Sequence, residues 1–139
     1  MEKPQIVGNT IVIPSSLDYL VDVDSFVEGL LRGFGLDEST IADIAISVSE
    51  LVNNAISHGN KSSPEKTVTV EVGRENSSVR ISVTDEGEGF NPDDIDSPIA
   101  EENLLKEVGR GIFIVESLMD EVEVKNVNGA TTITIKKTI

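Results

Sequence analysis

The strongest periodic pattern in the sequence is Asp37-Glu-Ser-Thr-Ile-Ala-Asp-Ile-Ala-Ile-Ser-Val-Ser-Glu-Leu-Val-Asn-Asn-Ala-Ile-Ser-His58. Its apolar residues recur at intervals of three and four, which is the spacing of one face of an α-helix. The pattern predicts a long helix that opens near Asp37 or Ser39. We expect Gly59 and Asn60 to end it. The predicted buried face consists of Ile41, Ile44, Ala45, Val48, Leu51, Val52, Ala55 and Ile56.

The polar side of this helix carries Glu50, Asn53, Asn54, Ser57 and His58. Such a stripe is typical of a helix face in contact with water. Two adjacent asparagines are poor helix formers, however, and Lys, Glu or Gln would build a surface helix at less cost. An asparagine amide oxygen can bind Mg²⁺ beside phosphates and water, and a carboxylate one turn away can accept a proton. The stripe is therefore either a solvated face or part of a site.

Two elements are predicted before this helix. Residues 5–13 are rich in β-branched side chains and end at Pro14, which predicts one strand. Ser15 or Ser16 then caps a predicted helix that runs to about Arg32. The apolar residues that lie mostly on one side of that helix are Leu17, Leu20, Val21, Phe26, Val27, Leu30 and Leu31.

After the long helix, strands dominate the pattern. Alternating valines and isoleucines over 68–72 and 79–83 predict two antiparallel strands. A third helix is predicted over 111–119, and a final pair of strands over 121–127 and 131–137. This order of elements predicts an α+β fold, a two-layer sandwich in which helices cover one face of a mixed, mostly antiparallel sheet.

Length and composition narrow the class of protein. The chain has 139 residues, which predicts a single domain over 1–139, and 38% of them are hydrophobic. The net charge of −14 disfavours binding to nucleic acid or to an anionic membrane surface. With no cysteine and one histidine, the chain has no disulfide or thiolate site and no multi-histidine metal site. We also find no membrane-spanning run and no signal peptide, and therefore expect a soluble cytoplasmic protein.

A second motif follows the strand that ends near residue 84. The segment Asp85-Glu-Gly-Glu-Gly89-Phe is consistent with an ordinary turn. Its other interpretation is a ligand pocket, in which Asp85 accepts a hydrogen bond from a ligand amine while Gly87 and Gly89 allow close approach of the backbone. The stretch over 86–108 is rich in Gly, Pro, Asp and Glu, and a loop of that length is usually functional or mobile.

A third motif, Gly109-Arg110-Gly111, opens the predicted third helix. Glycines at that point can simply give flexibility to the start of a helix. They can also expose backbone N–H groups at the positive end of the helix, where an anion binds, and Arg110 would add charge.

The three motifs in this order resemble the boxes of the GHKL (Bergerat-fold) ATPases. The boxes are Glu50-Leu-Val-Asn-Asn54-Ala-Ile-Ser-His58-Gly, Asp85-Glu-Gly-Glu-Gly89-Phe and Gly109-Arg-Gly-Ile-Phe-Ile-Val-Glu116. Within that superfamily the chain is most similar to the small anti-sigma-factor serine kinases, through Ser-Glu-Leu-Val-Asn-Asn-Ala and Gly111-Ile-Phe-Ile-Val-Glu-Ser-Leu-Met-Asp-Glu121-Val. The resemblance covers about residues 11–137.

The resemblance implies a role for each box. Glu50 would be the general base and Asn54 the Mg²⁺ ligand, while Asp85 would bind the adenine amino group of ATP. Residues 91–108 would form a lid over the nucleotide. The implied nucleotide-binding residues are Asn54, His58, Asp85, Gly87, Gly89, Lys106, Gly109, Arg110, Gly111 and Thr131.

The resemblance also implies partners. Family members hold a sigma factor inactive and use ATP to phosphorylate a serine on a small antagonist protein; relatives commonly dimerise. The chain departs from the family pattern at Glu107, where some relatives have a basic lid residue, and at Ala130, where the family often has glycine before Thr131. A non-catalytic module that binds a nucleotide and sequesters a partner is therefore the alternative function.

Overall fold

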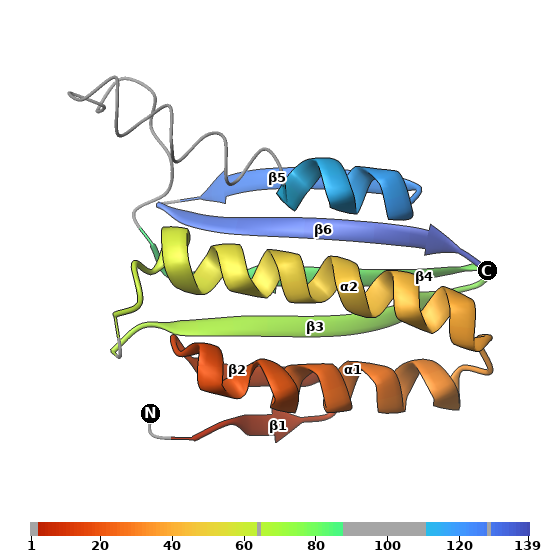
Figure 1. The fold of residues 1–139 in the computed structure, drawn as a ribbon, viewed down its shortest axis with the longest axis horizontal. Coiled ribbons are helices and arrows are strands. Elements are labelled where there is room, and N and C mark those ends of the chain that lie inside the picture. Colours follow the sequence, from red (N-terminus) through yellow and green to blue (C-terminus); the bar gives the residue numbers. More distant parts are fainter. Residues whose placement is uncertain (1–2, 64, 88–110, 128) are drawn as a thin grey trace.

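The computed structural model of the chain describes residues 3–63, 65–87, 111–127 and 129–139. These residues form a six-stranded sheet in the order β1-β2-β3-β4-β6-β5, in which every neighbouring pair is antiparallel. The helices lie side by side on one face of the sheet (Figure 1). The predicted α+β sandwich is confirmed. The strands are β1 (Gln5–Val7), β2 (Thr10–Pro14), β3 (Thr67–Glu75), β4 (Ser78–Thr84), β5 (Glu121–Val127) and β6 (Ala130–Thr138).

The core lies between the sheet and the helices. In the central hairpin Val70 pairs with Val83 and Val72 with Ile81, and all four side chains are buried on the helix side. Burial of an aliphatic side chain of this size contributes about 1.5–3 kcal/mol each. Every residue of the predicted helix face from Ile41 to Ile56 is buried as well. The alternating pattern of the strands therefore builds the sheet layer, and the three-to-four spacing of the long helix builds the helix layer.

The N-terminal segment differs from its prediction. Residues 5–13 were expected to form one strand, but β1 and β2 form a hairpin with register Val7 to Thr10. Gly8 sits at the reversal with φ +59, a conformation that glycine adopts without strain. The prediction read through Gly8 and Asn9, although such a pair between two short apolar runs is a hairpin signal.

The first helix is also shorter and rotated relative to the prediction. A 3₁₀ turn, η1 (Leu17–Tyr19), precedes α1 (Leu20–Gly33), and Ser16 caps the turn by accepting a hydrogen bond from the Asp18 N–H. The buried residues of α1 are Val23, Val27 and Leu31, spaced by four. Leu17 and Val21, which were predicted to join this face, are exposed because the tighter first turn changes the phase of the helix.

The long helix has the predicted start and an unusual end. Asp37 caps α2 (Glu38–Asn54) by accepting a hydrogen bond from the Thr40 N–H at 2.7 Å. The chain then continues as a π-helical turn, η2 (Ala55–Gly59), which closes with the Asn60 N–H donating to the Ala55 carbonyl at 2.8 Å. A π turn of this kind widens the helix, and such turns are frequent at functional sites.

The C-terminal part agrees with its prediction. Residues 111–118 are helical, and β5 and β6 follow. The Lys137 Nζ donates to the Leu118 carbonyl at 2.7 Å, so a positive charge lies at the C-terminal end of this helix, where it is favourable.

Candidate functional site

The first and third motifs meet where the helix over 111–118 begins beside α2 (Figure 1). A Cβ atom placed on Gly111 would lie 2.8 Å from Asn54 Nδ2 and 3.4 Å from Glu50 Oε2. Only a residue without a side chain brings the backbone this close to both polar groups. The fold therefore brings Glu50, Asn54 and Gly111 together, as the sequence predicts.

Asn54 has an unsatisfied polar atom. Among the described residues, its Nδ2 is the buried side-chain nitrogen or oxygen that lacks a hydrogen-bond partner. A buried polar group in that state costs free energy unless something outside the protein satisfies it. The neighbouring stripe residues Asn53 and Ser57 instead pair with each other, through the Ser57 hydroxyl and Asn53 Oδ1 at 3.4 Å. The polar stripe thus divides, and its Glu50–Asn54 edge is the one that faces Gly111.

Asp85 lies at the end of β4, only 6% exposed. Its Oδ1 accepts hydrogen bonds from the Gly87 N–H at 3.0 Å and the Thr131 N–H at 3.2 Å. The Asp85 N–H in turn donates to the Thr131 carbonyl at 3.0 Å. These bonds fix the carboxyl group and leave Oδ2 without a donor among the described residues.

Burial raises the pKa of Asp85 above its ordinary value. The hydrogen bonds from Gly87 and Thr131 oppose this effect because they favour the charged form, and the charge of Lys66 opposes it further. Asp85 is thus a buried acid that is oriented by backbone donors and surrounded by little water. Such a group is suited to recognise a polar ligand atom.

Gly59 and Gly87 allow the chain to close tightly around Asp85. A Cβ atom on Gly59 would overlap the Asp85 carboxyl group, at 2.6 Å from its Cγ. A Cβ atom on Gly87 would overlap the backbone of Gly59, at 2.6 Å from its carbonyl carbon. Gly87 was predicted as a site residue; Gly59 was interpreted only as a helix stop. The sequence signal for Gly59 is its place directly after His58 at the end of the polar stripe.

Thr131 contacts Asp85 through its backbone. Its hydroxyl donates to Asn126 Oδ1 at 2.6 Å, across the β5–β6 pair. The structure therefore brings Thr131 to the candidate site, and its predicted contact with adenine stays a prediction. His58 lies half-buried in η2, between Asn54 and Gly59.

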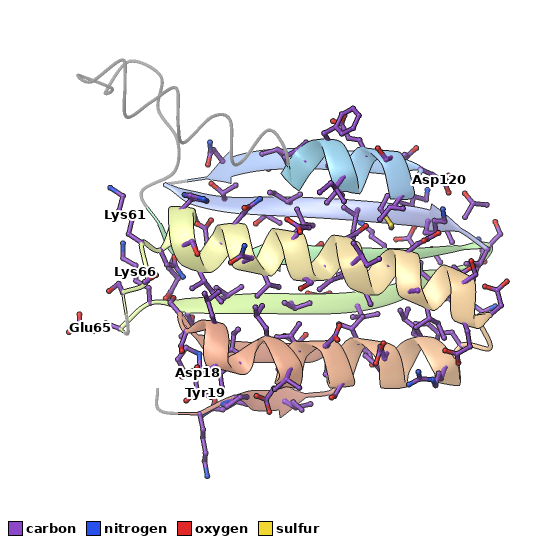
Figure 2. The ribbon with its side chains drawn as sticks, in the orientation of Figure 1. Asp18, Tyr19, Lys61, Glu65, Lys66 and Asp120 are labelled. Atoms are coloured by element: carbon purple, nitrogen blue, oxygen red, sulfur yellow. The ribbon has the colours of Figure 1, made fainter. Side chains whose placement is uncertain are left out.

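Two lysines lie at the same end of the sheet, where η2 leads into β3. Lys61 and Lys66 are both placed there (Figure 2). Lys61 and Ser62 adopt positive φ angles of 51° and 56°, which residues other than glycine rarely adopt. Backbone of this kind is found where surrounding contacts fix it, commonly at functional sites.

Several predicted site residues lie outside the described residues. They are Gly89, Lys106, Gly109, Arg110 and the lid over 91–108, which includes Glu107. Their proposed roles stay predictions.

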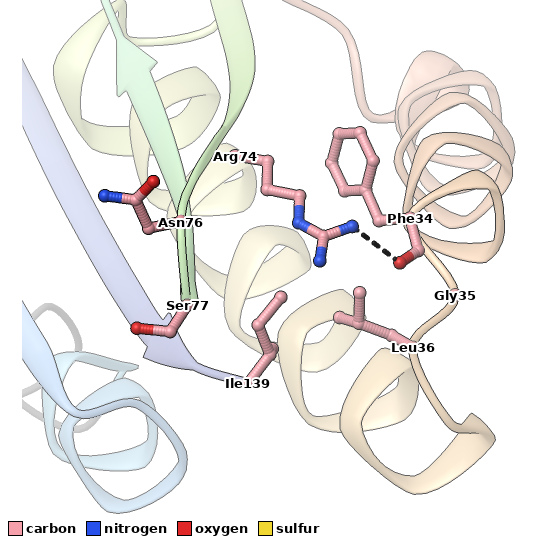
Figure 3. A pocket seen from close by; sticks show the side chains of 7 residues that line it. All are labelled: Phe34, Gly35, Leu36, Arg74, Asn76, Ser77 and Ile139. Carbon is pink, nitrogen blue, oxygen red and sulfur yellow. Dashed lines mark hydrogen bonds between the residues drawn. The ribbon is translucent and has the colours of Figure 1, made fainter.

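Two cavities lie away from this site. One, of about 310 Å³, is at the opposite end of the sheet and is lined by Phe34, Leu36, Arg74 and Ile139 among others (Figure 3). In it the Arg74 guanidinium donates to the Phe34 carbonyl at 2.9 Å and thereby caps the C-terminal end of α1. The other, of about 400 Å³, lies between β1 and α1. None of the predicted site residues lines either cavity.

The residues present fit a nucleotide with a metal ion. Glycines bring the backbone close to Asn54 and to Asp85, and the buried Asn54 Nδ2, a hydrogen-bond donor that suits a phosphate oxygen, lacks a partner. No cluster of three His, Asp or Glu side chains that could hold a metal occurs in the described part of the chain. A metal at Asn54 would therefore need further ligands from phosphate and water, which is the usual situation of Mg²⁺ in nucleotide sites. Among the same residues, no helix is long and apolar enough to cross a membrane.

Comparison with known proteins agrees with this geometry. The profile of the histidine kinase-like ATPase domain matches residues 13–137. The serine-protein kinase RsbW of Bacillus subtilis is 30% identical over 125 residues, which are 86% of this chain and 78% of that protein. The protein of the same name from Staphylococcus epidermidis is 32% identical over 133 residues, 89% of this chain and 82% of its own length.

Solved structures share the fold. A crystal structure of the RsbU and RsbW domains of a Mycobacterium tuberculosis protein has a TM-score of 0.63 at 24% identity, and the match covers 96% of this chain and 33% of that one. The histidine kinase domain of a blue-light activated kinase from Erythrobacter litoralis has a TM-score of 0.58 at 24% identity, over 91% of this chain and 61% of that one. With the profile match and the identities above, the chain belongs to the histidine kinase-like ATPase family, in the group of the RsbW serine-protein kinases.

Proposed function

We propose that this protein is an ATP- and Mg²⁺-dependent protein serine kinase that acts as an anti-sigma regulatory factor. The observation that carries the proposal is that the Gly111 backbone lies beside both Glu50 and Asn54, where the buried donor Asn54 Nδ2 lacks a partner. A carboxylate and an amide beside a helix start are the groups that phosphoryl transfer needs for a base, a metal ligand and an anion site. The names of the relatives support the same reaction.

Glu50 would act on the acceptor serine. In this proposal the serine hydroxyl oxygen bonds to the γ-phosphorus of ATP, the bond from that phosphorus to the β,γ-bridging oxygen breaks, and ADP leaves. Glu50, whose Oε2 lies on the side of α2 that faces Gly111, would take the hydroxyl proton. Mg²⁺, when bound, neutralises charge on the phosphate oxygens, and Asn54 would hold it through its amide oxygen.

Asp85 would recognise adenine. Gly87 and Thr131 hold its Oδ1, so Oδ2 is the atom available to accept a hydrogen bond from the adenine amino group. Gly59 and Gly87 let the surrounding backbone pack closely against Asp85. The same residues suit adenine better than guanine, because guanine presents a carbonyl oxygen where adenine presents an amino donor.

The proposed partners are a sigma factor and a small antagonist protein whose serine is phosphorylated. The net charge of −14 favours a basic surface on the partner that is held. A homodimer is part of the same proposal, by analogy with the group, as is a cytoplasmic location.

Glu50→Gln tests the kinase. We expect calorimetric titration to give unchanged Mg²⁺-dependent ATP affinity, while transfer of labelled phosphate to candidate antagonist proteins falls by about 10²–10⁴-fold, because the amide cannot take the proton. Asp43→Asn is the matched control, since Asp43 is a carboxylate on the same helix two turns earlier and touches none of the site glycines. That variant should transfer phosphate at the normal rate.

Each other result has a definite meaning. Wild-type transfer by Glu50→Gln would exclude Glu50 as the base. ATP binding by the wild type without transfer to any candidate would favour the non-catalytic module that sequesters its partner. Absence of ATP binding to folded protein would contradict the proposed function as a whole.

A further inference from the structure

We propose that Asn60 is a positioning residue of the nucleotide pocket: its buried amide fixes the peptide between Asp85 and Glu86 and so sets the direction of the Asp85 carboxylate. The proposal rests on the proposed function, in which Asp85 recognises adenine. Sequence reasoning assigned Asn60 only the end of a helix, and the structure gives it a different place.

Asn60 is 1% exposed and joins three separate segments. Its Nδ2 donates to Ser15 Oγ at 2.8 Å, after β2, and to the Thr67 carbonyl at 2.9 Å, at the start of β3. Its Oδ1 accepts from the Glu86 N–H at 2.8 Å, after the end of β4. Both donor hydrogens and the acceptor of the amide are therefore used.

The hydrogen bond to Glu86 replaces a missing strand contact. The β3–β4 ladder begins at Thr69 and Thr84, so the residues beyond it have no backbone partner on the β3 side. On the β6 side Asp85 is held by Thr131, and on the β3 side the Glu86 N–H is held by Asn60. The peptide before Asp85 is thus held by β6 and the peptide after it by Asn60, so the backbone is fixed on both sides of Asp85.

A second contact supports the same segment. The Glu86 carboxylate accepts from the Thr67 N–H at 2.5 Å and from the Thr67 hydroxyl at 3.1 Å. Thr67 is the residue whose carbonyl already binds Asn60. The positive φ angles at Lys61 and Ser62 follow directly, so strained backbone adjoins Asn60.

Asparagine is the side chain that fits this place. Aspartate has the same shape but lacks the two donors, and glutamine is one methylene longer in a space without exposure. Asn60 holds the turn that carries Asp85, yet its side-chain hydrogen bonds go to Ser15, Thr67 and Glu86 and not to the Asp85 side chain. Its effect on ATP is therefore expected to pass through the Asp85–Glu86 backbone.

The test compares two branches of the same hydrogen-bond cluster. Asn60→Ala removes the bond to Glu86, whereas Ser15→Ala removes the hydroxyl that accepts from Asn60 and donates to the Lys66 carbonyl, and leaves the Glu86 bond intact. Full-length proteins are titrated calorimetrically with ATP and with purine riboside triphosphate, which lacks the amino group, well below each thermal midpoint.

We expect the wild type to prefer ATP by about tenfold, the usual value of one hydrogen bond to a charged group. Asn60→Ala should lose most of this preference. Ser15→Ala should lower the thermal midpoint and keep the wild-type preference. A purely structural Asn60 would lower stability in both variants and leave the ratio of the two affinities unchanged.

A measurement on the wild type covers the case in which Asn60→Ala does not fold. The Asn60 side-chain amide and the Glu86 backbone amide should shift more in NMR spectra on addition of ATP than of purine riboside triphosphate. Equal shifts, or a wild-type ratio retained by Asn60→Ala, would overturn the role of Asn60 and leave the kinase proposal standing. A wild type that binds both ligands equally would remove the adenine contact of Asp85 and this inference together.

Discussion

At Gly111, the absence of a side chain allows the backbone to lie close to the side chains of Asn54 and Glu50. The Cβ that Gly111 lacks would lie 2.8 Å from Asn54 Nδ2, closer than such atoms approach in proteins. The Asn54 amide can move to admit it, so the fold should tolerate the change while the site should not.

Gly111→Ala is therefore expected to weaken Mg²⁺-dependent ATP binding by about tenfold with little change in thermal midpoint. Calorimetric titration with and without Mg²⁺ measures this. Gly29→Ala is the matched control, because Gly29 lies in α1 with nothing within 4 Å of its added Cβ. The control should gain about 0.5–1 kcal/mol of stability and bind ATP normally. Normal binding by Gly111→Ala would show that the space beside Asn54 is not used.

Individual residues also mark the limit of prediction from sequence. Glu50, Asn54, Asp85, Gly87 and Gly111 were found because each belongs to a spaced motif. Their contacts are described by the structure, and their chemical roles stay predictions. Asn60 was missed because a Gly-Asn pair after a helix is the ordinary signal of a helix end. Only the meeting of three chain segments reveals its second use.

At the level of elements, the start of α2 depends on one side chain. The hydroxyl of Thr40 and, to a lesser extent, its N–H donate hydrogen bonds to Asp37, and they lower the pKa of this carboxyl below its ordinary value. A lowered pKa means that the folded state favours the charged carboxylate. Its contribution to stability is present above the unfolded-state pKa and is lost as the pH falls through the folded-state value.

Asp37→Ala should therefore lower the thermal midpoint near pH 7, and the loss should shrink at an acid pH below the folded-state pKa, where the wild-type carboxyl is also neutral. Asp37→Asn keeps an acceptor at the cap and should lose much less at either pH. Thermal unfolding followed by circular dichroism at the two pH values measures the difference. An equal loss at both would mean that the charge of Asp37 has no part in the cap.

The elements were predicted with uneven success, for physical reasons. The predictions of the buried face of α2 and of the β3–β4 hairpin were correct, because in a long periodic pattern only one face can bury all the apolar side chains. The β1–β2 hairpin was missed because each of its strands is very short, so that the two-residue Gly8-Asn9 turn was read as part of one strand. The π turn was missed because shifting one backbone hydrogen bond leaves the side-chain pattern unchanged.

The whole molecule carries far more negative than positive charge. Its net charge is −14, and the ion pairs found among the described residues, such as Arg32 with Glu38, lie on the surface. Exposed pairs contribute little, so repulsion between unpaired carboxylates dominates the electrostatic free energy.

Added NaCl should therefore raise the thermal midpoint near pH 7, because screening reduces the repulsion of the folded state more than it weakens surface pairs. Scanning calorimetry between about 20 mM and 500 mM NaCl measures the effect. Near the sequence pI of about 4.3 the rise should disappear, since the net charge is then close to zero. A midpoint that falls with salt near neutral pH would contradict this balance.

The pairing of β4 with β6 is expected to be a late step in folding. Strands β3 and β4 are joined by the short turn at Asn76 and Ser77, whereas Thr84 pairs with Thr132, far along the chain. Contacts between residues that are far apart in the sequence form slowly, because a longer loop of chain must be ordered before they can form. Asp85 receives the Thr131 N–H only when that closure is complete. A newly made chain would then become able to hold ATP at the end of its folding, so that nucleotide capture would distinguish mature molecules from unfinished ones.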